Sequence, residues 1–140
     1  MSFDSVVLVQ LGILVFGTLH TNSASKTIDR IIDAFPANQQ EQIRAQLSVS
    51  IQGVISQVLL PRKDGRGRVA AFEVLLMTPA VSNLIRKNET NKIPSTIQTS
   101  KKLGMITLDD FLLELHKKGL ITRETALESA QDDKDLEVRL

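Results

Sequence analysis

A long apolar run near the amino end constrains this chain most. Residues Val6 to Phe16 are aliphatic or aromatic except for Gln10 and Gly12. A run without period-two alternation is typical of a strand covered on both faces, as in the parallel sheets of α/β proteins. The run is too short to cross a bilayer, which takes about 20 residues, and the acidic start around Asp4 lacks the positive region of a secretory signal. It therefore predicts a buried strand in an α/β fold.

Polar side chains follow the end of this predicted strand. Thr18, His20 and Thr21 come within a few residues of each other, in a position from which they can face a phosphate group. A histidine at a strand end is more often a hydrogen-bonded structural residue, and threonine is also a common strand residue. From the residues alone, both interpretations of this cluster stay open.

The other histidine and the composition exclude several kinds of site. His116 falls in the last turn of a predicted helix, where a positive or polar side chain suits the helix dipole. His20 and His116 have no third partner at metal-ligand spacing, so no metal site is expected. Because the chain has no cysteine, disulfides and thiolate zinc sites are excluded.

Apolar residues at helical spacing follow the polar cluster. One amphipathic helix is predicted from Ala24 to Phe35, closed by Pro36. A second is predicted from Asn38 onward, passing into an extended segment at 57–60, with apolar positions Ile43, Leu47, Ile51, Val54, Ile55 and Val58.

A charged turn at Pro61 to Gly67 separates two apolar segments at 58–60 and 68–76. The Asp64-Gly65 pair favours a tight reversal between strands. Although the turn is basic and glycine-rich, it lacks the Lys-Ser/Thr ending of a phosphate-binding loop and does not lead into a helix. The segment predicts a β-hairpin.

Four short helices are predicted after the hairpin. Thr78, Thr107 and Thr122 are placed as N-caps, and Gly104 and Gly119 as helix ends. A second helix of this set follows Pro94, and residues 132–140 form a charged, frayed tail.

The net charge says little about partners, but its distribution is uneven. The chain has 17 basic and 16 acidic residues, a net charge of +1, which gives no reason to expect nucleic acid. Residues 62–102 hold nine Lys or Arg against three Asp or Glu, and residues 103–140 hold five against nine. The two regions can be solvated helix faces, two faces of one domain, or a contact between subunits.

Four segments, in order, carry a resemblance to one family. The chain resembles the type IV pilus retraction (twitching motility) ATPases, within the ring-forming secretion ATPases. The segments are the "His box" at 14–24 with the helix sequence at 24–36, the stretches at 55–60 and 67–73, the motif at 78–87 similar to Ala-Ile-Arg-Asn-Leu-Ile-Arg-Glu, and Leu-Gly-Met-x-Thr-Leu-Asp at 103–109. The related extension ATPases usually carry a four-cysteine zinc insertion near Leu60, and the absence of cysteine favours the retraction branch.

The resemblance implies a fold and a domain organisation. It implies an α/β chain that is the C-terminal portion of a RecA-like P-loop ATPase domain, with few strands including a hairpin, followed by a small bundle of short helices. Residues 1–77 would be the partial RecA-like core, 78–131 the C-terminal helical subdomain and 132–140 the charged tail. The family's phosphate-binding loop and Walker B segment lie upstream of the match, and no Gly-x-x-x-x-Gly-Lys-Ser/Thr run occurs in the sequence.

The resemblance also implies a function. Members couple ATP hydrolysis to pilus retraction in a cytoplasmic hexamer, peripheral to the inner membrane, with ATP and Mg²⁺ as cofactors. For this chain alone it implies no bound nucleotide and no activity of its own. Ring neighbours, or self-association, and the inner-membrane proteins of the pilus base are the implied partners. Neither nucleic-acid binding nor a membrane span is implied.

The resemblance assigns two sets of site residues. Thr18, His20 and Thr21 would sense the nucleotide through the His box, and His20 is placed as the γ-phosphate sensor. Contact with a partner would be made by Asn83, Leu84, Ile85 and Arg86. From the residues alone, Leu84 and Ile85 can equally be core and Arg86 solvated.

Some positions depart from the family pattern. Ile13 stands where the His box carries an earlier histidine, and Val81, Ser82 and Lys87 replace Ile, Arg and Glu of the third motif. The loss of the Arg and the reversed final charge put the carried-over partner contact in question.

Three hypotheses follow from the sequence. The first is the C-terminal part of a retraction motor, inactive without an upstream segment. The second is a non-catalytic module that binds the pilus ATPase ring or the pilus base and regulates it. The third is a remnant without function. Leaving Val6 to Phe16 exposed would forfeit on the order of 15 kcal/mol of burial, so self-association of the isolated chain is expected.

Overall fold

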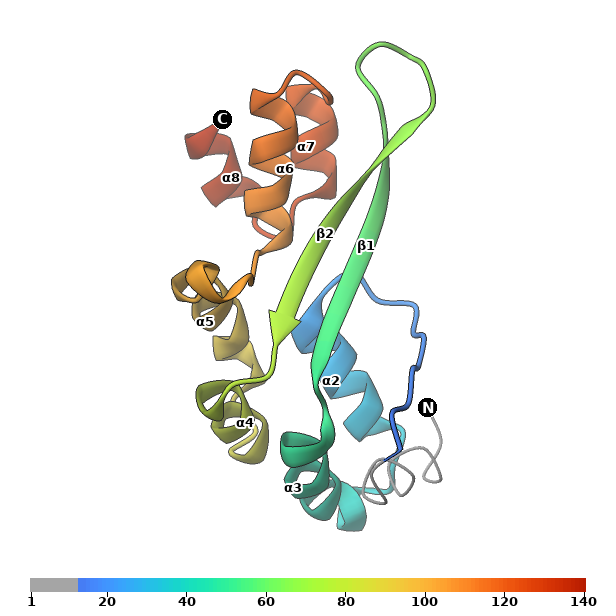
Figure 1. The fold of residues 1–140 in the computed structure, drawn as a ribbon, viewed down its shortest axis with the longest axis vertical. Coiled ribbons are helices and arrows are strands. Elements are labelled where there is room, and N and C mark those ends of the chain that lie inside the picture. Colours follow the sequence, from blue (N-terminus) through green and yellow to red (C-terminus); the bar gives the residue numbers. More distant parts are fainter. Residues whose placement is uncertain (1–12) are drawn as a thin grey trace.

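A long antiparallel hairpin organises the fold (Figure 1). The computed structural model describes residues 13–140. In it, β1 (Gly53–Pro61) pairs with β2 (Arg68–Leu76) along the whole length of both strands, from Gly53 opposite Leu76 to Pro61 opposite Arg68. Gly65 and Gly67 adopt positive φ angles of 70° and 79° in the connecting turn, a conformation that glycine adopts without strain. The predicted hairpin is confirmed.

Two amphipathic helices precede the hairpin. Helix α2 (Ala24–Asp33) is followed by a 3₁₀ turn (Ala37–Gln39) and by α3 (Gln40–Ser50). The sequence prediction extended α3 too far, because Val54 and Ile55 belong to β1. Val54 is buried and its neighbour Ile55 is 71% exposed, and this alternation of buried and exposed side chains has the two-residue period of a strand. Pairing with β2 provides hydrogen-bond partners for the backbone of this strand.

Five helices follow the hairpin, with 3₁₀ turns at Thr90–Lys92 and Lys101–Leu103. They are α4 (Pro79–Arg86), α5 (Ile93–Thr99), α6 (Leu108–Lys117), α7 (Arg123–Ser129) and α8 (Asp133–Arg139). The predicted caps are confirmed, since the hydroxyls of Thr78, Thr107 and Thr122 accept from the N–H of Val81, Asp110 and Thr125.

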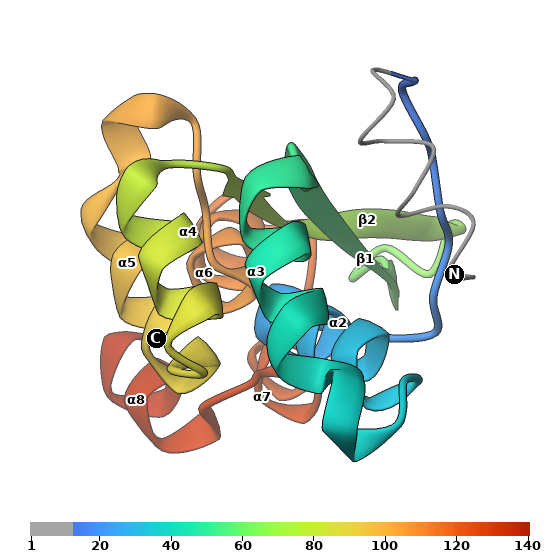
Figure 2. The same ribbon diagram turned by 90° about the horizontal axis from the view of Figure 1, so that it is seen from below.

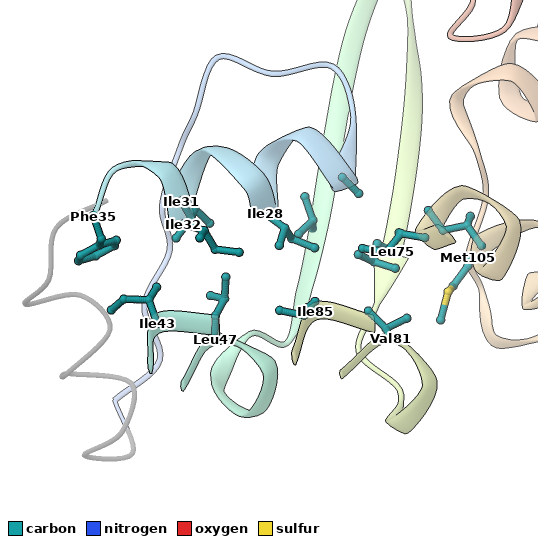
Figure 3. Close-up of a cluster of buried hydrophobic side chains, with 14 residues drawn as sticks. Ile28, Ile31, Ile32, Phe35, Ile43, Leu47, Leu75, Val81, Ile85 and Met105 are labelled. Carbon is teal, nitrogen blue, oxygen red and sulfur yellow. The ribbon is translucent and has the colours of Figure 1, made fainter. Parts of the chain in front are cut away.

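The apolar side chains form two clusters. The first joins α2, α3, α4 and α5 to one end of the hairpin (Figure 3). Helices α3 and α4 lie side by side in this cluster (Figure 2). The second cluster joins Leu60 and Ala71, near the turn end of the hairpin, to α6, α7 and α8. The predicted boundary between 1–77 and 78–131 stays a prediction, and the packing groups α4 and α5 with α2 and α3.

The carboxyl end differs from the frayed tail expected from its charge. Residues 133–139 form α8, with Asp132 as its N-cap. Leu136 has no exposed surface, and Arg139 pairs with Asp110. Arg123 of α7 also pairs with Glu137 of α8. The buried Leu136 and these two ion pairs hold the helix, although most of its side chains are charged.

The strand expected at the start of the described chain is absent there. Residues 13–23 have no regular secondary structure, and Leu14 and Phe16 are 70% and 89% exposed. A strand needs a hydrogen-bonded neighbour, and within residues 13–140 the sheet consists of β1 and β2 alone. Positions 6–12 of the predicted strand lie outside the described residues.

No helix within residues 13–140 combines the length and the apolar character needed to cross a membrane.

Candidate functional site

An open groove of about 970 Å³ runs between the segment at 13–21 and the helices and strands beneath it. Its lining comes from that segment, from α2 and α3, from the first half of β1 with the two residues before it, and from the end of β2. Phe16 and Ile55 are 89% and 71% exposed along it. Ser56, only 5% exposed, also lines the groove, and its Oγ has no hydrogen-bond partner among the described residues. The groove is therefore largely apolar, and the Ser56 hydroxyl in it is buried without a hydrogen-bond partner among the described residues.

The structure separates the three predicted sensing residues. Thr18 and Thr21 line the groove, whereas the exposed His20 does not. The hydroxyl of Thr21 is hydrogen-bonded to that of Thr27 in α2, and the carbonyl of His20 accepts from Nη1 of Arg30 at 2.8 Å. The His20 imidazole itself makes no hydrogen bond to any described residue.

Glu73 is a buried residue to which the sequence analysis gave no role. It lies in β2 on the same face as Ala71 and Leu75 and is 1% exposed. Its Oε1 accepts from the N–H of Ala24 at 2.7 Å and its Oε2 from the N–H of Leu108 at 3.3 Å. One carboxylate thus satisfies the first N–H of both α2 and α6. The sequence signal was a charged residue at an inward-facing strand position, where charge is rare unless it is paired.

Burial and hydrogen bonding act on Glu73 in opposite directions. Burial penalises the charged form and raises the pKa of Glu73 above its ordinary value, and the nearby charge of Asp109 adds to this rise. Hydrogen bonds from Ala24, Leu108 and the side chain of Gln131 lower the pKa but do not cancel the effect of burial.

Asp109 holds the linker between α7 and α8. Its Oδ1 and Oδ2 accept from the backbone N–H of Gln131 and Asp132 at 2.8 and 2.9 Å. The Gln131 side chain in turn donates from Nε2 to the carbonyl of Asn22 at 2.8 Å. The loop before α2 is therefore tied to the carboxyl-terminal helices through two carboxylates and one amide.

The first N–H of α2 is not open to a phosphate. The N-terminus of α2 directly follows the His box, and helix N-termini commonly bind phosphate. Here the carboxylate of Glu73 accepts from the first N–H of that helix, which places a negative charge where a phosphate would bind. Nowhere in residues 13–140 do three His, Asp or Glu side chains gather closely enough to hold a metal ion.

The residues expected to contact a partner lie on α4 with different exposures. Asn83 and Arg86 are exposed, Leu84 is half-buried, and Ile85 has no exposed surface. Figure 3 shows Ile85 in the first cluster, on the side opposite Ile28. Burial gives Ile85 a packing role, and the contact of this motif with a partner stays a prediction.

His116 lies in the last turn of α6, as expected. Its Nδ1 is 3.4 Å from the carbonyl oxygen of Ile121, so the ring bridges α6 and the connection that leads to α7.

The matches found by sequence and by structure are to one group of proteins. No protein-family model matches the chain. It is 54% identical over 122 residues to the type IV pilus retraction ATPase PilT of Pseudomonas aeruginosa, covering 87% of this chain and 35% of that protein. It is 50% identical over 127 residues to a twitching motility protein of Neisseria gonorrhoeae, covering 91% of this chain and 34% of that protein.

A solved structure extends the similarity to the fold. The crystal structure of the pilus retraction motor PilT with bound ADP matches with a TM-score of 0.83 and 45% identity, over 99% of this chain and 39% of that one. The chain spans about a third of the length of the curated relatives it matches. By sequence and by fold, the chain is related to the type IV pilus retraction ATPases and corresponds to a C-terminal part of them.

Proposed function

We propose that this chain is the C-terminal part of a type IV pilus retraction motor and works only beside the portion that carries the phosphate-binding loop. The observation that carries the proposal is the identity of 50% and 54% to twitching motility and retraction proteins, maintained over nearly the whole chain. In this role the chain acts in a cytoplasmic ring at the base of the pilus, peripheral to the inner membrane. Its partners are ring neighbours and pilus base proteins.

The apolar groove is the face on which the upstream portion packs. Its lining includes the exposed Phe16 and Ile55 and the unpaired hydroxyl of Ser56. A monomeric protein rarely leaves such a surface uncovered. Packing there would bring Thr18 and Thr21, with His20 beside them, up to the nucleotide held by the upstream portion. There they would sense the γ-phosphate, with ATP and Mg²⁺ bound by the complete motor.

A regulatory module that binds the ring without hydrolysing ATP is the second candidate. The observation that favours it is the Glu73 carboxylate at the N-terminus of α2, which opposes phosphate binding there. Both candidates predict that the isolated chain binds no nucleotide, so titration with fluorescent ATP tests their shared claim. Micromolar affinity would overturn it.

Co-expression separates the two candidates. The chain is expressed with the upstream portion of the P. aeruginosa retraction ATPase, truncated where the match to this chain begins. The motor proposal expects a stable complex with ATPase activity, disrupted by a double change of Phe16→Glu and Ile55→Glu. Val138→Glu serves as the control, because Val138 is 88% exposed on α8 and does not line the groove. A chain that binds the intact ring but neither associates with the truncated portion nor restores its activity would favour the regulatory module.

A further inference from the structure

The polar junction around Glu73 joins four stretches that are distant in the sequence. The loop at 22–24, strand β2, the start of α6 and the α7–α8 linker meet there. Five hydrogen bonds between these stretches join a side chain of one to the backbone of another. The side chain–backbone distances at Ala24, Asn22, Gln131 and Asp132 are 2.7 to 2.9 Å. Backbone groups are thus fixed in place by side chains from other stretches.

Glu73 occupies the centre of this junction. One of its carboxylate oxygens holds α2 and the other holds α6, although these helices belong to different apolar clusters. The strand carrying it is also bridged to the segment before α6, because Val74 and Ile106 exchange backbone hydrogen bonds of 2.9 and 3.2 Å. A shift of α6 relative to β2 would therefore break a hydrogen bond of Glu73.

The loop that carries His20 and Thr21 depends on few other contacts. Within α2, Arg30 holds the carbonyl of His20, and Thr27 holds the hydroxyl of Thr21 and the carbonyl of Ser23. Outside α2, Gln131 holds the carbonyl of Asn22 and Glu73 holds the N–H of Ala24, and of these two residues Glu73 is the buried one. Buried charge-assisted hydrogen bonds are stronger than exposed neutral ones, so the Glu73 contact is the main external anchor.

We propose that Glu73 is a positioning residue that makes the placement of the loop carrying His20 and Thr21 depend on the docking of α6. The inference concerns contacts within the chain and stands independently of the motor role. A movement of the carboxyl-terminal helices would loosen the loop, and an ordered loop would favour their docked position.

Backbone amide exchange measured by NMR on the full chain tests the proposal. In Glu73→Ala both anchors are lost, and we expect the amides of residues 22–24 and of Leu108 to exchange on the order of tenfold faster. Glu73→Gln keeps one oxygen as acceptor, while its amide group cannot accept from the second N–H. Glu73→Gln should therefore restore protection from amide exchange either at residues 22–24 or at Leu108, but not at both, and the NMR signals of the His20 ring should shift.

Thr107→Ala is the matched control. It removes a different acceptor at the same helix N-terminus, the one for the N–H of Asp110 at 3.2 Å, and the Thr107 hydroxyl makes no hydrogen bond to residues 20–24. It should speed exchange in α6 and leave the His20 ring signals and residues 22–24 unchanged. The proposal is overturned if Thr107→Ala changes that loop as much as Glu73→Gln does. It is also overturned if the loop in Glu73→Gln keeps its protection and its His20 signals. Because Glu73→Gln is nearly isosteric, the test remains informative if Glu73→Ala does not fold.

Discussion

The guanidinium of Arg139, in the last helix, pairs with the carboxylate of Asp110 in the first turn of α6. Lys101 pairs with the other oxygen of the same carboxylate at 2.8 Å. Asp110 is 5% exposed, so two cations from different segments compensate one buried anion. Together with Leu136, this arrangement docks α8 on the rest of the chain.

Asp110 should make the chain less stable in acid. Burial alone would raise the pKa of Asp110, but its hydrogen bonds and ion pairs with Lys101 and Arg139 outweigh burial and lower the pKa below the ordinary 3.8. A carboxylate whose pKa is lower in the folded state than in the unfolded state stabilises the fold at pH values above its unfolded-state pKa. This stabilisation is lost as the pH falls through the folded-state pKa. Urea unfolding of Asp110→Asn should show a loss of about 1.5 to 3 kcal/mol at pH 7 that shrinks below pH 3.8. Glu128→Gln, an exposed change in α7, should show no such loss. An equal loss for Asp110→Asn at pH 7 and at pH 2 would contradict this expectation.

Glu73 predicts a pH dependence of the opposite sign. Burial raises the pKa of Glu73 above 4.5 despite its hydrogen bonds. At pH values between the pKa of Glu73 in the unfolded state and its higher pKa in the folded state, the folded state binds more protons. The stability of the fold therefore falls as the pH rises through that interval. The free energy of unfolding of the wild type, relative to Glu73→Gln, should therefore decline from pH 4.5 upward. A difference that grows with pH would show that the hydrogen bonds dominate over burial.

The exposed apolar segment should drive self-association of the isolated chain. Leu14 and Phe16 are 70% and 89% exposed beside an apolar groove, and burying such side chains gains about 1.5 to 3 kcal/mol each. Sedimentation velocity should show species above 15.5 kDa for the wild type and a shift toward monomer for Leu14→Glu with Phe16→Glu. Val138→Glu, away from the groove, should leave the distribution unchanged. A wild-type chain that is monomeric at high concentration would refute the prediction.

Ile28 should contribute strongly to the stability of the first apolar cluster. Its side chain has no exposed surface and is directed toward Ile85 in Figure 3. Ile28→Ala should cost about 2 to 5 kcal/mol, because it removes buried methyl groups and leaves a cavity. Val49→Ala, at a position 68% exposed on α3, should cost less than 1 kcal/mol, as exposed changes usually do. Thermal unfolding followed by circular dichroism measures both, and equal losses would place Ile28 outside the core.

The sequence by itself determined the local elements and the relationship to other proteins. Periodicity gave α2, the Asp64-Gly65 turn gave the hairpin, and the threonine caps marked three helix starts, because these signals depend on neighbouring residues. The relationship to the family came from four motifs that the chain keeps in order, with departures at Ile13, Val81, Ser82 and Lys87. An apolar run alone could not show that residues 13–16 lack a strand partner, since pairing depends on other segments.

Only the tertiary structure decided the roles of isolated charged residues. Glu73 lies 49 positions from Ala24 and 35 from Leu108, so no local pattern links it to the helices that it caps. Arg139 and Asp110 are 29 positions apart, which is why composition alone predicted a frayed tail where α8 is docked. Such contacts form only when packing of the apolar side chains brings distant segments together, and this packing is decided by the whole fold.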